Sequence, residues 1–133
     1  MWELLLRVAE WLGTLARSPL SLEVRSLSMD EIKNRQGDSL VIISPYPRRY
    51  YAELSLTNRS GKTVYVKTIE LRGPYGKLYR DPDQQPMKIE PGELKHYDAI
   101  FPLDDGEQPV TGNFAIVVRP AVGRKANRRA VLR

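Results

Sequence analysis

The feature that most constrains this chain is a pair of apolar-alternating runs between Tyr50 and Leu71. In the first run, Ala52, Leu54 and Leu56 fall on one face and polar residues fall on the other, which is the period of two that a half-buried strand requires. The second run, Thr63–Leu71, is rich in β-branched residues, which suit a pleated sheet. Because neither run has the 3.6-residue period of a helix, the chain is predicted to consist mainly of β-strands.

The linker between the two runs, Asn58–Lys62, contains asparagine and glycine, which tolerate the positive φ of tight turns. It predicts that the two runs form a β-hairpin. Within the second run the apolar positions change phase, since Val64 and Val66 are followed by Ile69. A regular strand cannot move its apolar side chains to the other face, so a β-bulge is predicted near Lys67–Thr68.

Further strands are predicted by short apolar runs, separated by turn signals at intervals of roughly 8 to 12 residues. They are Leu20–Ser28, Leu40–Ile43, Lys77–Arg80, Met87–Ile89, Leu94–Leu103, Phe114–Val118 and Arg129–Leu132. The odd positions of the fifth of these runs, among them Ala99 and Phe101, are expected to face the core. The continuously apolar Phe114–Val118 is typical of a central strand. The whole pattern predicts an all-β, antiparallel sandwich of about seven or eight strands.

Ahead of these strands, the segment WELLLRVAEWLGTLA, residues 2–16, is predicted to form an amphipathic α-helix. Ser18-Pro19 ends it, because the residue before a proline is disfavoured in the α region. A helix that lies on one sheet needs an apolar stripe only about 100° wide, and this stripe is about twice that width on a helical wheel. The sequence thus divides into an N-terminal apolar helix over residues 1–18 and a β-sandwich domain over residues 19–133.

The wide apolar face of this helix leaves three roles open. The helix could be buried against the sandwich, pack against other copies of the chain, or anchor in a membrane interface. Trp2 and Trp11 favour the anchor, whereas the shortage of Lys and Arg on the polar edge opposes it. The helix is too short and too charged to span a bilayer, and Glu3 argues against a signal peptide. The residues expected to contact a partner are Trp2, Leu4, Leu5, Val8, Trp11, Leu12 and Leu15.

Three motifs of the strand region resemble immunoglobulin-like or fibronectin-type-III-like sandwiches. They are the V-x-V-x-x-I-x-L pattern of residues 64–71, the turn Ile89–Glu93, and the run Phe114–Val118 followed by Gly123. The resemblance covers residues 20–133. The cysteine pair and core tryptophan of true immunoglobulin domains are missing, since the chain has no cysteine and both tryptophans lie in the N-terminal segment. The resemblance implies a binding or scaffolding module without naming a ligand.

The net charge of +5 is concentrated at the C-terminal end of the chain. Arg119–Arg133 holds six bases and no acid, whereas the other 118 residues hold 15 bases and 16 acids. Such a segment is a candidate for binding the phosphates of nucleic acid or of a membrane surface; the alternative is a solvated edge that prevents strand-to-strand aggregation. A second candidate is the aromatic and basic stretch Tyr46–Tyr51, of the kind that stacks bases. The candidate phosphate-binding residues are Arg48, Arg49, Arg124, Lys125, Arg128 and Arg129.

No catalytic or metal-binding signature stands out. The single histidine, His96, has no cysteine or recognisable serine motif to work with, so a structural role is expected. The acids of Asp81–Asp83 and Asp104–Glu107 lie beside proline or glycine in turns, where aspartate is common for its own backbone hydrogen bonds. Neither group matches a calcium-loop signature. We therefore expect no enzyme activity, no cofactor and no bound metal.

These observations lead to the hypothesis of a non-enzymatic protein-interaction or scaffolding module. Its N-terminal helix is expected to mediate self-association or docking to a protein partner or a membrane surface. A cytoplasmic location, with membrane association as the alternative, fits the absence of cysteine. The competing hypothesis is a nucleic-acid-binding accessory protein that uses the basic C-terminal segment.

Overall fold

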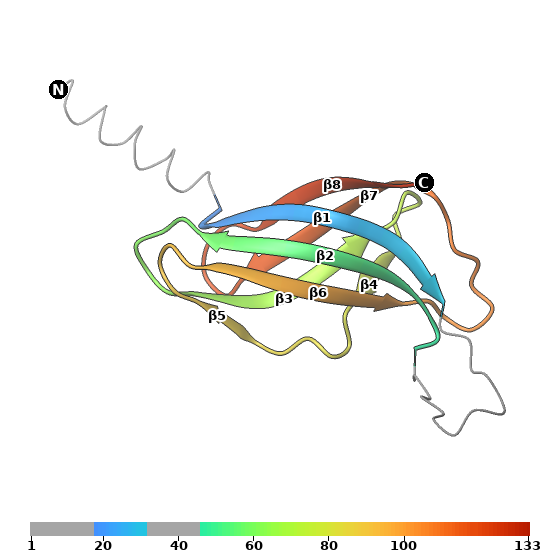
Figure 1. The fold of residues 1–133 in the computed structure, drawn as a ribbon, viewed down its shortest axis with the longest axis horizontal. Helices are drawn as coiled ribbons and strands as arrows, with labels where there is room; N and C mark the ends of the chain where they lie inside the picture. Colours follow the sequence, from blue (N-terminus) through green and yellow to red (C-terminus); the bar gives the residue numbers. More distant parts are fainter. Residues whose placement is uncertain (1–17, 32–45) are drawn as a thin grey trace.

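The computed structural model describes residues 18–31 and 46–133, and these residues form eight β-strands (Figure 1). The strands are β1 (Leu20–Glu31), β2 (Arg48–Asn58), β3 (Val64–Arg72), β4 (Leu78–Arg80), β5 (Met87–Ile89), β6 (Leu94–Pro102), β7 (Gly112–Pro120) and β8 (Ala126–Leu132). One antiparallel sheet has the order β1-β2-β6. The other has the order β4-β3-β7-β8, and β5 also pairs with β3. The predicted helix over residues 2–16 and the predicted strand Leu40–Ile43 lie outside the described residues.

The two sheets lie as two layers around one core, in the manner of a β-sandwich (Figure 1). Tyr50 of β2 is completely buried and its ring meets those of Tyr79 at 5.2 Å and Phe114 at 5.1 Å, both from the opposite sheet. Ala99 and Phe101 of β6 are also completely buried, which confirms the predicted inward face of that strand. The all-β class and the antiparallel pairing expected from the sequence are therefore present.

The predicted hairpin is wrong, although both of its strands exist. β2 pairs with β1 and β6, whereas β3 pairs with β4, β5 and β7, so the chain crosses from one sheet to the other. The buried side chain of Asn58 stabilises this crossing. Its Nδ2 donates to the carbonyl oxygens of Lys62 at 2.7 Å and of Ile89 at 2.9 Å, and its Oδ1 accepts from the backbone N–H of Ser60 at 2.9 Å. Since Ile89 belongs to the second sheet, these bonds hold the linker as an arch between the layers.

The predicted bulge in β3 is confirmed. The register between β3 and β7 shifts between Val66 and Thr68, and both Val66 and Ile69 are buried in the core. The extra residue is what lets the strand keep an apolar side chain inward on each side of the shift. A second bulge, between Val24 and Ser26 of β1, was not predicted.

The position of β7 in its sheet agrees with the sequence prediction, whereas the start of β8 does not. β7 lies between β3 and β8, as its continuous apolar run predicts. The last strand begins at Ala126, earlier than the predicted start at Arg129, because Ala126 is already paired with Val118. The polar Asn127 and Arg128 between these two positions hid the beginning of the strand.

Candidate functional site

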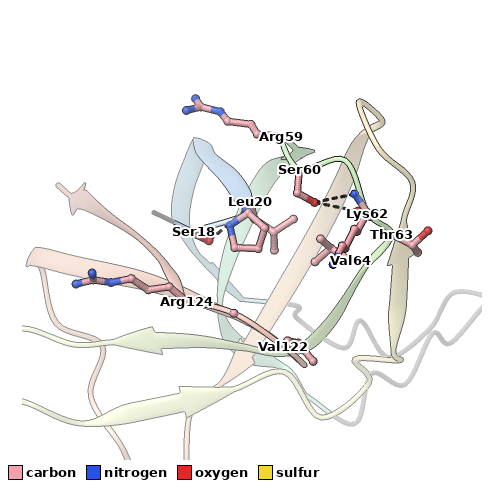
Figure 2. A pocket seen from close by; sticks show the side chains of 11 residues that line it. Ser18, Leu20, Arg59, Ser60, Lys62, Thr63, Val64, Val122 and Arg124 are labelled. Carbon is pink, nitrogen blue, oxygen red and sulfur yellow. Dashed lines mark hydrogen bonds between the residues drawn. The ribbon is translucent and has the colours of Figure 1, made fainter. Parts of the chain in front are cut away.

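A cleft opens at the end of the sandwich where β1 begins and β2 ends (Figure 2). Its volume is about 730 Å³, and its walls come from the start of β1, the arch between β2 and β3, and the turn between β7 and β8. Leu20 and Val64, both buried, lie on its inner side. Figure 2 shows Arg59 and Arg124 reaching out on either side of Leu20. The cleft thus combines an apolar floor with a basic rim.

A smaller hollow of about 240 Å³ shares Leu20 and Arg59 with the cleft and continues along the seam between β1 and β8. Lys125 and Arg128 line it. The bases around the two hollows, which we call the basic end, are Arg59, Lys62, Arg124, Lys125 and Arg128. All five are exposed, and none of the described residues that line the two hollows is acidic. A surface of one charge sign is suited to an anionic partner.

Backbone contacts hold the three segments of the basic end together. The N–H of Arg59 donates to the carbonyl oxygen of Pro19 at 2.8 Å, which joins the arch to the start of β1. Gly123 in the β7–β8 turn has a φ of 105°, a conformation open to glycine, and a Cβ there would lie 3.4 Å from the Pro19 ring. A backbone hydrogen bond and close packing against Pro19 therefore fix the walls of the cleft.

Two arginines of this end donate to uncharged acceptors. Arg59 donates to the Ser21 hydroxyl at 2.8 Å, and Arg128 donates through Nε to the carbonyl oxygen of Leu22 at 3.0 Å. Both acceptors are uncharged, so the positive charge of the two guanidinium groups stays available. Among residues 18–31 and 46–133, no ion pair to a carboxylate involves Arg59, Lys62, Lys125 or Arg128.

The acids closest to the arch are already paired. Glu90 and Glu93 lie in the turn between β5 and β6, where Glu90 meets Lys88 at 3.0 Å and Glu93 meets Lys95 at 3.9 Å. The hydrogen bond from Lys88, followed by the one from Thr63, lowers the pKa of Glu90. Both carboxylates therefore have a lysine partner of their own on β5 or β6.

The phosphate-binding residues expected from the sequence lie in three different parts of the structure. Arg124, Lys125 and Arg128 come together at the basic end. Arg129 pairs with Ala115 on the outer face of the second sheet, because consecutive residues of a strand point to opposite faces. The sequence did not identify Arg59 and Lys62, whose only signal was their position in the glycine-containing linker. The expected partner-binding residues of the N-terminal segment lie outside the described residues.

Arg48 and Arg49 lie at the opposite end of the sandwich and serve the fold there. Arg48 donates to the carbonyl oxygens of Glu107 at 2.7 Å and of Asp104 at 3.1 Å. Arg49 forms an ion pair with Asp30 at 3.2 Å. The suggested base-stacking stretch around them is wrong for Tyr50, since its ring is completely buried in the core.

We call this opposite end the closed end, because its charges satisfy one another. Lys77 binds the carboxylates of Asp104, at 2.7 Å, and Glu107, and the hydroxyl of Tyr79 donates to Glu107 at 2.7 Å. Burial, followed by this hydrogen bond, raises the pKa of Tyr79. Partial burial alone would raise the pKa of Glu107, but hydrogen bonds from Lys77, Tyr79 and the Asp104 backbone outweigh it and lower that pKa.

The other acids singled out in the sequence also have structural partners. Asp81 is buried and accepts hydrogen bonds from the Tyr97 hydroxyl at 2.9 Å, the Ile100 N–H at 3.2 Å and the Asp83 N–H at 2.9 Å. Burial, followed by the bond to Asp81, raises the pKa of Tyr97. This aspartate ties the loop before β5 to the edge strand β6, as a turn residue with its own backbone bonds would.

His96 lies on the open outer face of the first sheet. Its Nδ1 is 2.9 Å from the hydroxyl of Ser55, its cross-strand neighbour. Neither cleft nor hollow includes either residue. Within the described ranges, no group of three or more histidine, cysteine, aspartate or glutamate side chains is placed to hold a metal ion.

Comparison with protein-family models finds no match for this chain, and comparison with curated protein sequences finds none either. In the part of the chain that the structure describes, no helix has the length and apolar character needed to cross a membrane.

Proposed function

We propose that the protein is a non-enzymatic interaction module built on an immunoglobulin-like or fibronectin-type-III-like sandwich. The sheet orders support this fold: with β1, β2, β3, β6, β7 and β8 taken as strands A, B, C, E, F and G, the sheets contain A-B-E and C-F-G. One departure is that β4 and β5 pair with β3, whereas strand D of a constant-type immunoglobulin domain joins the A-B-E sheet. Such domains present their loops at the two ends of the sandwich, and one end here carries the cleft.

The observation that carries the proposal is the basic end with its apolar cleft. Ser18 and Leu20 line that cleft, so the N-terminal segment joins the sandwich at the site itself. That segment is apolar over most of its predicted helical surface and holds both tryptophans. We therefore assign the segment and the basic end to one binding region, which docks to a second copy of the chain, a protein partner or a membrane surface.

The experiment is a measurement of molar mass and partner binding with the full chain and a double variant, Leu5→Glu with Leu12→Glu. We expect the variant to lose self-association or partner binding, because charges would interrupt the apolar face, while its urea unfolding midpoint stays unchanged. A matched control is Glu3→Gln on the predicted polar edge. If the double variant unfolds, the segment belongs to the core and the proposal fails. If it binds and associates like the full chain, the proposal fails as well.

A second candidate function, a nucleic-acid-binding accessory protein, is favoured by the five exposed bases that line the two hollows, where none of the described lining residues is acidic. Its test is fluorescence anisotropy with a random oligonucleotide at low salt. Binding should weaken steeply with salt, since each phosphate contact releases a counterion. Absence of binding at low salt would remove this candidate.

A further inference from the structure

We propose that the partner of the basic end is an anionic lipid surface, which the bases contact while the N-terminal segment enters the membrane interface. This inference rests on the proposed function and names its partner. It concerns phospholipid headgroups in a bilayer, because what the basic end offers is a combination of charge and apolar surface, and not a specific pocket for one headgroup.

The fold supplies the bases that the N-terminal segment lacks. An interfacial helix normally carries lysines and arginines on its polar face, whereas residues 2–16 contain a single arginine, Arg7. The five bases of the basic end lie beside the point where this segment joins β1. A base close to an anionic membrane surface contributes about 1 kcal/mol, so the sandwich can provide the electrostatic part of the attraction.

An apolar side chain stands at the tip of the same surface. Val122, in the turn between β7 and β8, is 86% exposed and lines the cleft together with Arg124. Lys125 follows in the same turn. A bare valine ahead of two bases fits the boundary between acyl chains and headgroups, where apolar groups enter and cations stay with the phosphates. In water the exposed Val122 side chain buries no apolar surface and so does not stabilise the fold.

Two weak membrane signals are therefore joined at one end of the molecule. A single apolar anchor gives marginal and reversible binding, and stable attachment needs a second signal such as a basic patch. At the closed end Lys77 and Arg49 already pair with carboxylates and Arg48 donates to carbonyl oxygens, so the difference between the two ends favours contact with an anionic surface through the basic end.

The aromatic residues distinguish this partner from single-stranded nucleic acid. Proteins that bind single strands combine bases with aromatic rings on which nucleobases stack. The large exposed aromatics of the described residues are Tyr65, which lies on β3 and pairs with Lys88, and Tyr75, which lies in the β3–β4 turn. Neither lines the cleft or the adjoining hollow. Among the described residues that line the two hollows, the apolar groups are aliphatic, and these suit acyl chains better than nucleobases.

The test is co-sedimentation of the full chain with phosphatidylcholine vesicles and with vesicles in which about one third of the lipid is phosphatidylserine. We expect binding to the anionic vesicles that decreases as salt rises, with much weaker binding to the neutral ones. The double charge reversal Arg59→Glu with Lys125→Glu should lower the anionic-vesicle affinity more than about tenfold. The matched control, Arg72→Glu with Arg129→Glu on the outer face of the second sheet, should change it less than about twofold.

Each other outcome overturns the inference. The first is no binding to either vesicle. The second is equal binding to both with no effect of the basic-end reversals. The third is equal loss in the control pair, which would mean that total charge and not the basic end matters. A fourth is oligonucleotide binding that resists the vesicles in competition. If the full chain self-associates through its N-terminal segment but ignores vesicles, the lipid inference fails while the proposed function stands.

Discussion

At the closed end Lys77 is held between Asp104 and Glu107, whereas at the basic end Arg59 and Arg128 donate only to uncharged oxygens. Both ends join the same two sheets, and both are fixed by hydrogen bonds. The difference is that Lys77 at the closed end meets carboxylates, whereas Arg59 and Arg128 at the basic end keep their positive charge next to uncharged acceptors. Charge that does not serve the fold is the charge available to a partner.

At both ends the backbone of the loops is nevertheless fixed by side-chain hydrogen bonds. Asn58 closes the arch of the basic end with a buried amide, and Tyr50 closes the other end by accepting a hydrogen bond from the Val110 N–H at 2.9 Å. Rigid loops lower the conformational entropy that a binding surface loses when its partner docks. The comparison therefore separates two properties, backbone order and charge compensation, which can be tested one at a time.

Asn58→Ala should have the largest effect on stability. It removes the bond to the Lys62 carbonyl oxygen, which keeps its bond from the Ser60 hydroxyl, and the buried bond to the Ile89 carbonyl oxygen. The expected loss is about 2 to 4 kcal/mol in the free energy of unfolding, measured by urea denaturation. Asn127→Ala, at an exposed position of β8, is the control and should stay within about 0.5 kcal/mol. Equal losses in both would show that the basic end is not held by its arch.

Gly123→Ala should have the second largest effect, and it tests the β7–β8 turn, which forms another wall of the cleft. The alanine would adopt a φ of 105° with its Cβ 3.4 Å from the Pro19 ring, so we expect a loss of about 1 to 3 kcal/mol in the free energy of unfolding. Gly61→Ala in the arch is the matched control, because a Cβ there meets nothing within 4 Å. Thermal unfolding of the two variants measures the difference. A Gly123 variant as stable as the Gly61 variant would contradict the close turn described here.

Glu107→Gln addresses the closed end through its pH dependence. The pKa of Glu107 is lowered in the folded chain, so its ionised form adds stability above the ordinary glutamate value of about 4.3, and that stability is lost as the pH falls through the folded pKa. The variant should be less stable than the wild type by about 1 kcal/mol at pH 7. The difference should shrink below about pH 4. Urea unfolding at several pH values checks both, and a difference that grows on acidification would refute the assignment.

The strands and the bulge could be predicted because they depend on local patterns. Alternation in β2 and the phase change before Ile69 reflect which side chains face the core, and each can be recognised within a few residues. The hairpin failed for a physical reason. Which sheet β3 joins depends on long-range contacts, namely its pairing with β7 and the bond from Asn58 to Ile89, 31 residues along the chain. No local propensity reports a contact of that range.

The basic end could be predicted only in part for the same reason. Arg124, Lys125 and Arg128 form a cluster in the sequence, whereas Arg59 reaches them only through the arch and its bond to Pro19. Arg129 was grouped with its neighbours on the basis of charge alone. The alternation of side chains along a strand would have separated it from Arg128, had the start of β8 been recognised.

The smallest effect on stability should come from Lys125→Gln, and it gives the sharpest contrast between the ends. Lys125 is exposed and has no carboxylate partner among the described residues. Its loss should therefore change the free energy of unfolding by less than about 0.5 kcal/mol. Lys77→Gln, the same substitution at the closed end, should lower the free energy of unfolding more than Lys125→Gln does, because two carboxylates lose their cation.

Salt dependence makes that comparison decisive. Because the Lys77 ion pairs are partly exposed, added salt should reduce the gap between the Lys77 variant and the wild type, while the Lys125 variant follows the wild type at every salt concentration. If Lys125→Gln instead destabilised the fold as much as Lys77→Gln, the bases of the basic end would be serving the sandwich itself. The charge left for an anionic partner would then be smaller than the geometry indicates, and the argument for a binding role at that end would lose its basis.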